Sequence, residues 1–146
     1  MPLLIAGPAV PKGKKIDELV YQHSMFATTC ELAGVPIPKT VEFPSLADLI
    51  TGNGTPKHDA IFSYYRDFQR MVRTREHKLI LYPQAGRIQL FDLEKDPWET
   101  KSVADDPKYK GIKTTLFARL KTLQDDLGDS LDLQNSRRKE SRPSDA

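Results

Sequence analysis

Residues 77–93 are HKLILYPQAGRIQLFDL, and their pattern sets the architecture of the region around them. Two short apolar runs, 77–82 and 87–93, flank the turn-forming residues 83–86. Two earlier runs lie at 60–65 and 70–74, and the first has the β-branched and aromatic content of a strand. Three or four short strands joined by short turns favour an antiparallel meander.

An amphipathic helix is predicted after the meander. Asp106 and Pro107 form a helix start, with Asp as the N-cap and Pro at the first helical position. One apolar stripe then recurs at spacings of three and four and stops at Gly128; its members are Tyr109, Ile112, Leu116, Leu120, Leu123 and Leu127. We expect this helix to lie across one face of a sheet of about four strands.

The N-terminal third has a different pattern. Residues 2–6 are apolar throughout, which predicts a strand buried on both faces, and a start on such a strand suggests that neighbouring strands are missing. A helix is predicted over 20–33, ending at Gly34. Its expected apolar stripe is Met25, Phe26, Thr29, Leu32 and Ala33. A short helix over 45–50, with Ser45 as N-cap, precedes a Gly- and Pro-containing linker at 51–56.

Composition narrows the classes of protein. The 146 residues carry a net charge of +2, with 22 basic and 20 acidic side chains, which argues against a dedicated nucleic-acid binder. The single cysteine, Cys30, excludes an internal disulfide and a cysteine-based zinc cluster. No apolar run approaches the length of roughly 20 residues that a membrane span needs.

Four segments in order resemble the C-terminal part of sulfatases of the alkaline phosphatase superfamily. They are residues 2–8 with Gly13 and Lys14; residues 28–36, containing Leu-Ala-Gly; residues 70–74 with 78–80; and Leu-Phe-Asp-Leu at 90–93 followed by Asp-Pro-Trp-Glu at 96–99. The resemblance implies an α/β fold, an α+β fragment of the whole enzyme. Residues 1–55 would be the last strand and helix of the catalytic domain, incomplete here. Residues 56–131 would be a C-terminal subdomain of sheet plus helix, and residues 132–146 a disordered tail.

Full-length members of that family hydrolyse sulfate esters with a formylglycine nucleophile and a calcium ion. The resemblance places these groups upstream, so it implies no catalytic residue, no metal ligand and no cofactor in this chain. The implied role is structural and pocket-shaping, inactive alone, with the missing N-terminal sulfatase domain as partner and an anionic sulfated substrate nearby. Full-length relatives are often exported, but the sequence itself leaves the location open.

Four residues are candidates for a basic rim that admits an anionic substrate, namely Arg70, Arg73, Lys78 and His77. The competing interpretation is a solvated strand face whose cations pair with nearby acids, and simple alternation along the strands favours it. His23 and His77 are read as half-buried structural side chains, because neither is paired with a nucleophile, and His58 as an exposed one.

Other residues with possible chemistry receive structural interpretations. Cys30 is followed by Glu-Leu-Ala-Gly, which is not the formylglycine motif, and it reads as a small buried hydrophobe. Asp92, Asp96 and Glu99 could indicate calcium, but Asp-Pro at 96–97 reads as turn chemistry where the meander stops. Two alternatives to the sulfatase segment stay open: a non-catalytic module that binds sulfated glycans, and a fragment of a related phosphohydrolase.

Overall fold

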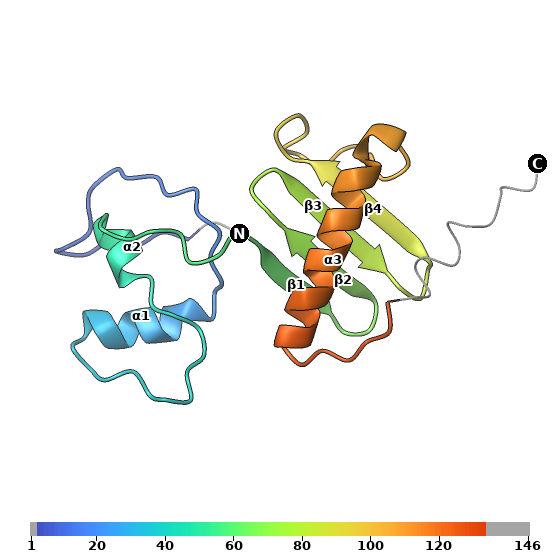
Figure 1. Ribbon diagram of the computed structural model, residues 1–146. Coiled ribbons are helices and arrows are strands. Elements are labelled where there is room, and N and C mark those ends of the chain that lie inside the picture. Colours follow the sequence, from blue (N-terminus) through green and yellow to red (C-terminus); the bar gives the residue numbers. More distant parts are fainter. Residues whose placement is uncertain (1–2, 134–146) are drawn as a thin grey trace, which may run out of the picture. The chain divides into compact units, whose positions relative to one another are not determined.

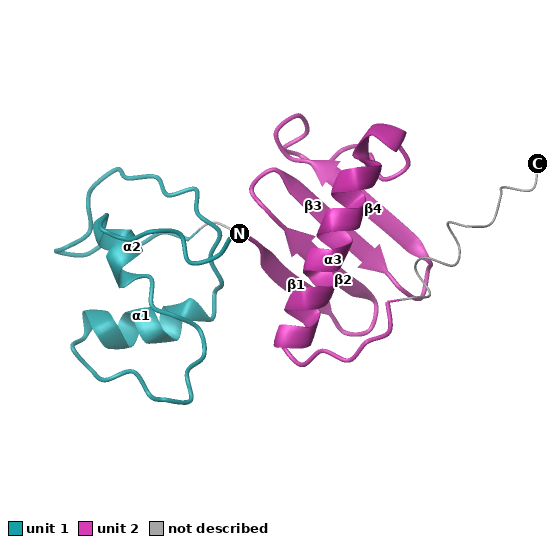
Figure 2. Ribbon diagram, viewed as in Figure 1, with its two compact units in different colours: residues 1–59 teal, residues 60–146 magenta. Residues whose placement is uncertain are grey.

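The computed structural model describes residues 3–133, and the chain divides into two compact units between Asp59 and Ala60 (Figure 2). Each unit has a buried apolar cluster of its own. The sequence predicts this boundary four residues earlier, between residues 55 and 56. Residues 56–59 belong to the first unit because the ring of His58 packs edge-on against Tyr21, at a centroid distance of 4.9 Å.

The second unit contains the predicted antiparallel meander, with strand order β1-β2-β3-β4 (Figure 1). Its strands are β1 Ile61–Tyr65, β2 Gln69–Arg73, β3 His77–Tyr82 and β4 Arg87–Asp92. These bounds agree with the expected runs to within one residue. The fold class, an α/β chain with a four-stranded antiparallel sheet and a C-terminal helix, is therefore confirmed.

One face of the sheet is apolar, and α3 (Lys110–Asp126) lies across it (Figure 1). The strand register sets Val72 opposite Leu79 and Leu79 opposite Leu90, so these side chains form a row on the same face. Leu120 of α3 is fully buried in the same cluster. The shared core is therefore built by the alternation of the strands and by the spacing of three and four in the helix.

The start of the C-terminal helix follows the sequence prediction, with one difference. Asp106 accepts a hydrogen bond from the backbone N–H of Lys108 at 2.9 Å, and Pro107 opens the first turn. That turn is a 3-10 helix, η1 (Pro107–Tyr109), before α3 begins. The apolar stripe ends at Leu123, because the helix stops at Asp126 and leaves Leu127 46% exposed.

The ordered chain extends beyond the predicted start of the tail at residue 132. Leu133 is buried in the core cluster of the second unit. Leu133 therefore packs with the second unit, one residue beyond the predicted start of the tail. The remainder of the predicted tail, residues 134–146, lies outside the described residues.

The first unit is built from two short helices, α1 (Ser24–Leu32) and α2 (Ala47–Thr51). The hydroxyl of Thr28 accepts a hydrogen bond from the backbone N–H of Leu46 at 2.9 Å and donates one to the Ser24 carbonyl at 2.6 Å. This contact ties α1 to the segment that leads into α2. Gly34 follows α1 with a φ of +68°, which fits its predicted role at the helix C-terminus.

Two expectations for the first unit are wrong. Residues 3–6 form no strand, and Leu4 is 93% exposed, because only Ile5 of this run packs on the local cluster. The predicted stripe of α1 is also displaced: the buried residues are Ser24, Ala27 and Thr28. The Thr28 hydrogen bonds turn the small-residue side of the helix inward. Ser45 caps the Ala47 N–H at 3.1 Å, one residue ahead of the helix's own N-cap position.

The packing of α3 on the sheet can be tested by placing a charge in it. We predict that Leu120→Asp lowers the free energy of unfolding by about 3–5 kcal/mol, since a carboxylate would replace a fully buried leucine. The matched control is Leu127→Asp at the exposed end of the helix, expected to cost within about 1 kcal/mol. Urea unfolding followed by circular dichroism measures both, and equal costs would contradict the packing described here.

Candidate functional site

The four candidate rim residues are divided between the two faces of the sheet. Arg73 and Lys78 are opposite each other in the β2–β3 register, on the face away from α3. Arg70 lies three residues before Arg73 on β2, so its side chain is on the opposite face of the sheet, where it is buried on the α3 side. His77 also lies on that side, where its ring is 6.3 Å from the ring of Tyr109. The expected proximity therefore holds for Arg73 and Lys78, while Arg70 and His77 lie elsewhere.

Arg70 is buried and anchors the chain that follows α3. Its Nε and Nη2 atoms both bond the Asp129 carboxylate, with Nη2 to Oδ1 at 2.9 Å. Its Nη1 atom donates to the carbonyls of Arg66 and Gln69, the latter at 2.9 Å. The guanidinium carbon lies 5.1 Å from the ring centroid of Tyr64. These contacts occupy the guanidinium, so Arg70 serves the fold rather than an open basic surface.

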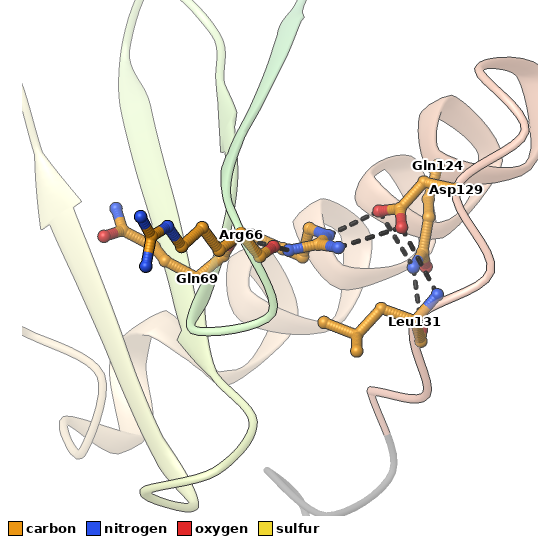
Figure 3. A network of polar contacts seen from close by, with 6 residues as sticks. Arg66, Gln69, Gln124, Asp129 and Leu131 are labelled. Atoms are coloured by element: carbon orange, nitrogen blue, oxygen red, sulfur yellow. Dashed lines mark hydrogen bonds and ion pairs between the residues drawn. The ribbon is translucent and has the colours of Figure 1, made fainter.

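Asp129 receives further donors from its own segment. Gln124 donates its side-chain N–H to Asp129 Oδ2 at 3.3 Å and to the Leu131 carbonyl at 2.8 Å, and the Leu131 backbone N–H bonds Oδ1 at 3.3 Å (Figure 3). The hydrogen bond from Arg70 is the main cause that lowers the pKa of Asp129 below its ordinary value of 3.8. The ionised carboxylate therefore holds residues 129–131 against the β1–β2 hairpin.

Asp92, the first of the three calcium candidates, is buried and already bonded within the protein. Its Oδ2 accepts from the Lys95 ammonium at 2.6 Å and from the Tyr109 hydroxyl at 2.7 Å. These two hydrogen bonds, the one from Lys95 first, hold the pKa of Asp92 well below its usual range and raise the pKa of Lys95. The group links the end of β4 to η1, which is a structural role.

Asp96 and Glu99 organise the loop after β4. The Asp96 carboxylate accepts from the Lys101 backbone N–H at 2.8 Å and from the Thr100 hydroxyl at 3.1 Å, and the backbone donors lower its pKa. Glu99 forms an ion pair with Lys78 at 2.7 Å. Each acid thus has separate donors from the protein. No group of three or more potential metal ligands occurs among residues 3–133.

The histidines of the first unit belong to an aromatic cluster. His23 is exposed and stacks on Phe43 at 4.8 Å, and Tyr21 contacts both Phe43 and His58. His58 is half-buried, which corrects the expectation that it is exposed, and burial lowers its pKa against the opposing effect of Asp59. His23, expected to be half-buried within the helix, instead occupies the N-cap position of α1.

Comparison with known proteins now identifies the chain. Residues 1–126 match the family model described as N-sulphoglucosamine sulphohydrolase, C-terminal. The chain belongs to this sulfatase family. A Delta 4,5-hexuronate-2-O-sulfatase of Bacteroides thetaiotaomicron is 33% identical over 123 residues, covering 77% of this chain and 26% of the relative. An arylsulfatase of Clostridium perfringens is 34% identical over 102 residues, covering 68% of this chain and 21% of the relative.

Solved sulfatase structures share the fold. A 2-O GAG sulfatase matches with a TM-score of 0.71 and 30% identity, over 97% of this chain and 31% of that one. The resemblance to the C-terminal part of sulfatases is therefore confirmed. This sulfatase segment spans about a quarter of the length of the curated relatives named above.

The sulfatase family implies calcium and formylglycine in full-length proteins, and the described residues do not fit either group. Cys30 is half-buried in α1 and is followed by Glu-Leu-Ala-Gly rather than by a formylglycine motif. The acids that could bind calcium, Asp92, Asp96 and Glu99, each accept from their own protein donors. No helix among residues 3–133 is long and apolar enough to cross a membrane.

Two residues of this sulfatase segment were missed in the sequence. Asp129 follows Gly128, which ends the helix, and its sequence context is that of an ordinary polar loop. Nothing in that context indicates that its partner is Arg70, 59 residues away. Trp98 was read only as part of the Asp-Pro-Trp-Glu segment. A single tryptophan inside a polar turn is a signal that could have indicated an exposed aromatic side chain.

The Arg70–Asp129 pair yields a stability prediction. Arg70→Met would leave the Asp129 carboxylate without its main partner, and we expect a loss of about 3–5 kcal/mol in the free energy of unfolding. Arg73→Met removes an arginine from the exposed end of the same strand and should cost within about 0.5 kcal/mol. Chemical denaturation of both variants at pH 7 measures the difference. Similar values would show that Arg70 is not an anchor.

The same pair predicts a pH dependence. Because the pKa of Asp129 is lowered in the folded state, its stabilising effect is present above about 3.8 and is lost as pH falls through the folded value. Asp129→Asn should therefore be less stable than the parent at pH 7, with a gap that narrows below about pH 4. Melting temperatures measured from pH 7 to pH 2.5 test this. A gap that stays constant across the range would contradict the ionised-carboxylate account.

Proposed function

We propose that this chain acts as the C-terminal part of a sulfatase, packing on the catalytic region and shaping the substrate pocket without cleaving the sulfate ester itself. The observation that carries the proposal is the surface of α1. Glu31 is the one charged residue of this nine-residue helix. The helix also carries large apolar side chains, and such side chains gathered at a surface can mark a contact with another part of a protein.

In the first unit, α1 is covered along a narrow stripe only. The buried residues are Ser24, Ala27 and Thr28, whereas Phe26 is 58% exposed and Leu32 is 52% exposed. Val35 and Ile37, in the loop that follows, are exposed as well. An apolar surface of this kind marks a site where another part of a protein packs. We call Phe26, Leu32, Val35 and Ile37 the α1 surface.

The sulfatase relatives supply the chemistry of the partner. The chain matches about a quarter of their length, and the remaining three quarters would contain the nucleophile and the metal ligands that the described residues lack. A sulfatase catalytic region is therefore the partner that we propose for the α1 surface. The named relatives above 30% identity are sulfatases, which favours this over a phosphohydrolase segment.

The substrate-rim role remains a prediction, now centred on Arg73 and Lys78. These two cations lie on the sheet face opposite to α3. A sulfate ester carries a negative charge, which basic side chains at a pocket mouth attract. Arg70 and His77 face the other way and would influence the rim only through the fold.

A direct assay tests the catalytic part of the proposal. The purified 146-residue protein, with added calcium, should release no product from a chromogenic aryl sulfate above the rate of buffer alone. The reason is that the described residues contain no nucleophile motif and no metal cluster. Turnover that disappears when a residue of this chain is substituted would overturn the proposal.

A chimera tests the docking part. Residues 3–133 would replace the matching segment of the Bacteroides hexuronate sulfatase, and the chimera should fold and retain sulfatase activity. Phe26→Asp within it should lower the yield of active enzyme at least about tenfold, because a charge would enter the contact. Phe68→Asp, at an exposed aromatic of the second unit, is the matched control and should leave activity unchanged. An inactive chimera, or equal effects of the two substitutions, would contradict docking through the α1 surface.

A further inference from the structure

His58 lies in the last segment of the first unit, residues 56–59, which leads into the second unit. Its ring is half-buried and packs edge-on against Tyr21, with the two ring centroids 4.9 Å apart. Tyr21 also contacts Phe43 at 5.0 Å and His23 at 6.5 Å, and His23 stacks on Phe43. The contact between His58 and Tyr21 therefore attaches the end of the first unit to an aromatic cluster that includes a second imidazole.

One nitrogen of the His58 ring has no hydrogen-bond partner. Its Nε2 atom is buried, and no group among residues 3–133 bonds it. Leaving a buried polar atom without a partner costs free energy, and the cost is much larger when the group is charged. A protonated ring would place an N–H donor and a positive charge where the described chain offers no acceptor. The packed position of His58 therefore favours the neutral imidazole.

The charged groups beside His58 do not reverse this preference. Burial lowers the pKa of His58 below its ordinary value of 6.5, against the smaller opposing effect of Asp59. The ammonium of Lys57, the residue before His58, bonds Asp48 at 2.8 Å. That hydrogen bond lowers the pKa of Asp48, so this ion pair stays charged over the range in which a histidine titrates. A change in charge between about pH 5 and pH 8 thus falls on the imidazole.

We propose that His58 is a pH-sensitive contact: the neutral imidazole holds residues 56–59 on the first unit, and uptake of a proton from the solvent releases them. Released, the imidazolium is solvated by water, which removes the cost of a buried charge. The ion pair of Lys57 with Asp48 is partly exposed, and such a pair contributes too little to hold the segment by itself. Release would free up to about 13 Å of extended chain before β1. Acidification would therefore lengthen the connection between the two units.

The direction of the pH dependence follows from the lowered pKa of His58. A base with a lower pKa in the packed state binds its proton more readily once it is released. The contact is therefore at full strength above about pH 6.5 and weakens as the pH falls below that value. Below the pKa of the packed state the effect is complete and changes no further.

An NMR titration of the 146-residue protein, from about pH 8 to about pH 5, tests the proposal on the parent chain. The ring protons of His58 should titrate with a midpoint below 6.5, and the backbone amide signals of Lys57 and Asp59 should move with the same midpoint. The amides of Leu79 and Leu90, in the core of the second unit, are the internal reference and should not follow. A midpoint at or above 6.5, or amide signals of Lys57 and Asp59 that do not follow the ring, would overturn the proposal.

Trypsin measures the release itself, because Lys57 is a cleavage site within the segment. His58→Phe keeps an aromatic ring against Tyr21 but cannot take up a proton. The rate of cleavage after Lys57 in the parent, divided by the rate in this variant, should rise at least about threefold between about pH 8 and pH 6. Comparing the two proteins at the same pH cancels the pH dependence of trypsin.

A matched variant separates His58 from the rest of the cluster. His23→Phe changes the exposed histidine that stacks on Phe43 and should be cleaved after Lys57 with the same pH dependence as the parent. A constant ratio for His58→Phe, or a pH dependence that is lost equally in His23→Phe, would contradict the proposal. If His58→Phe does not fold, as judged by circular dichroism, the titration of the parent decides alone.

Discussion

Leucine packing between α3 and the sheet is what allows the second unit to be a folded body. A four-stranded meander has two faces, and at least one must be covered before its strands are stable in water. Val72, Leu79 and Leu90 provide the covered face, and Leu120 of α3 completes it. Once the helix occupies that side, side chains of opposite parity along the strands must lie on the other. Arg73 and Lys78 therefore share the face opposite to α3 because of the register that builds the core.

The Arg70–Asp129 pair shows how the edge of this core is closed. Burying a guanidinium is costly, and the cost is offset only when its donors are matched. Here the partners come from both directions along the chain: two carbonyls from the β1–β2 hairpin and one carboxylate from beyond α3. These hydrogen bonds hold the segment after α3 against the second unit, and Leu133 at the end of that segment is buried in the core. The sequence suggests that Arg70 is part of a basic surface, but in the structure each of its guanidinium nitrogens is bonded within the protein.

Sequence reasoning succeeded where the structure depends on local pattern. The strands, the turn at 83–86 and the start at Asp106 follow from alternation, turn residues and capping, which act over a few residues. It failed where long-range contacts decide. The Thr28–Leu46 hydrogen bond turns α1 onto its small-residue side, and no periodicity within the helix contains that information. Residues 3–6 have the composition of a strand, but a strand also needs a partner with which to form its ladder.

In the candidate site, too, local features were predictable and long-range contacts were not. The proximity of Arg73 and Lys78 was predictable because the two residues lie on strands joined by a short turn. The burial of Arg70 was not, because its partner lies 59 residues away. Trp98 lies between these cases: it is exposed in a loop held by Asp96 and Glu99, two acids whose residue types alone are compatible with calcium. Asp96 and Glu99 each accept from separate protein donors, and no group of three or more potential metal ligands occurs in the part of the chain that the structure describes. The two carboxylates therefore shape the loop after β4, and the Lys78 partner of Glu99 lies 21 residues away, beyond the reach of local pattern.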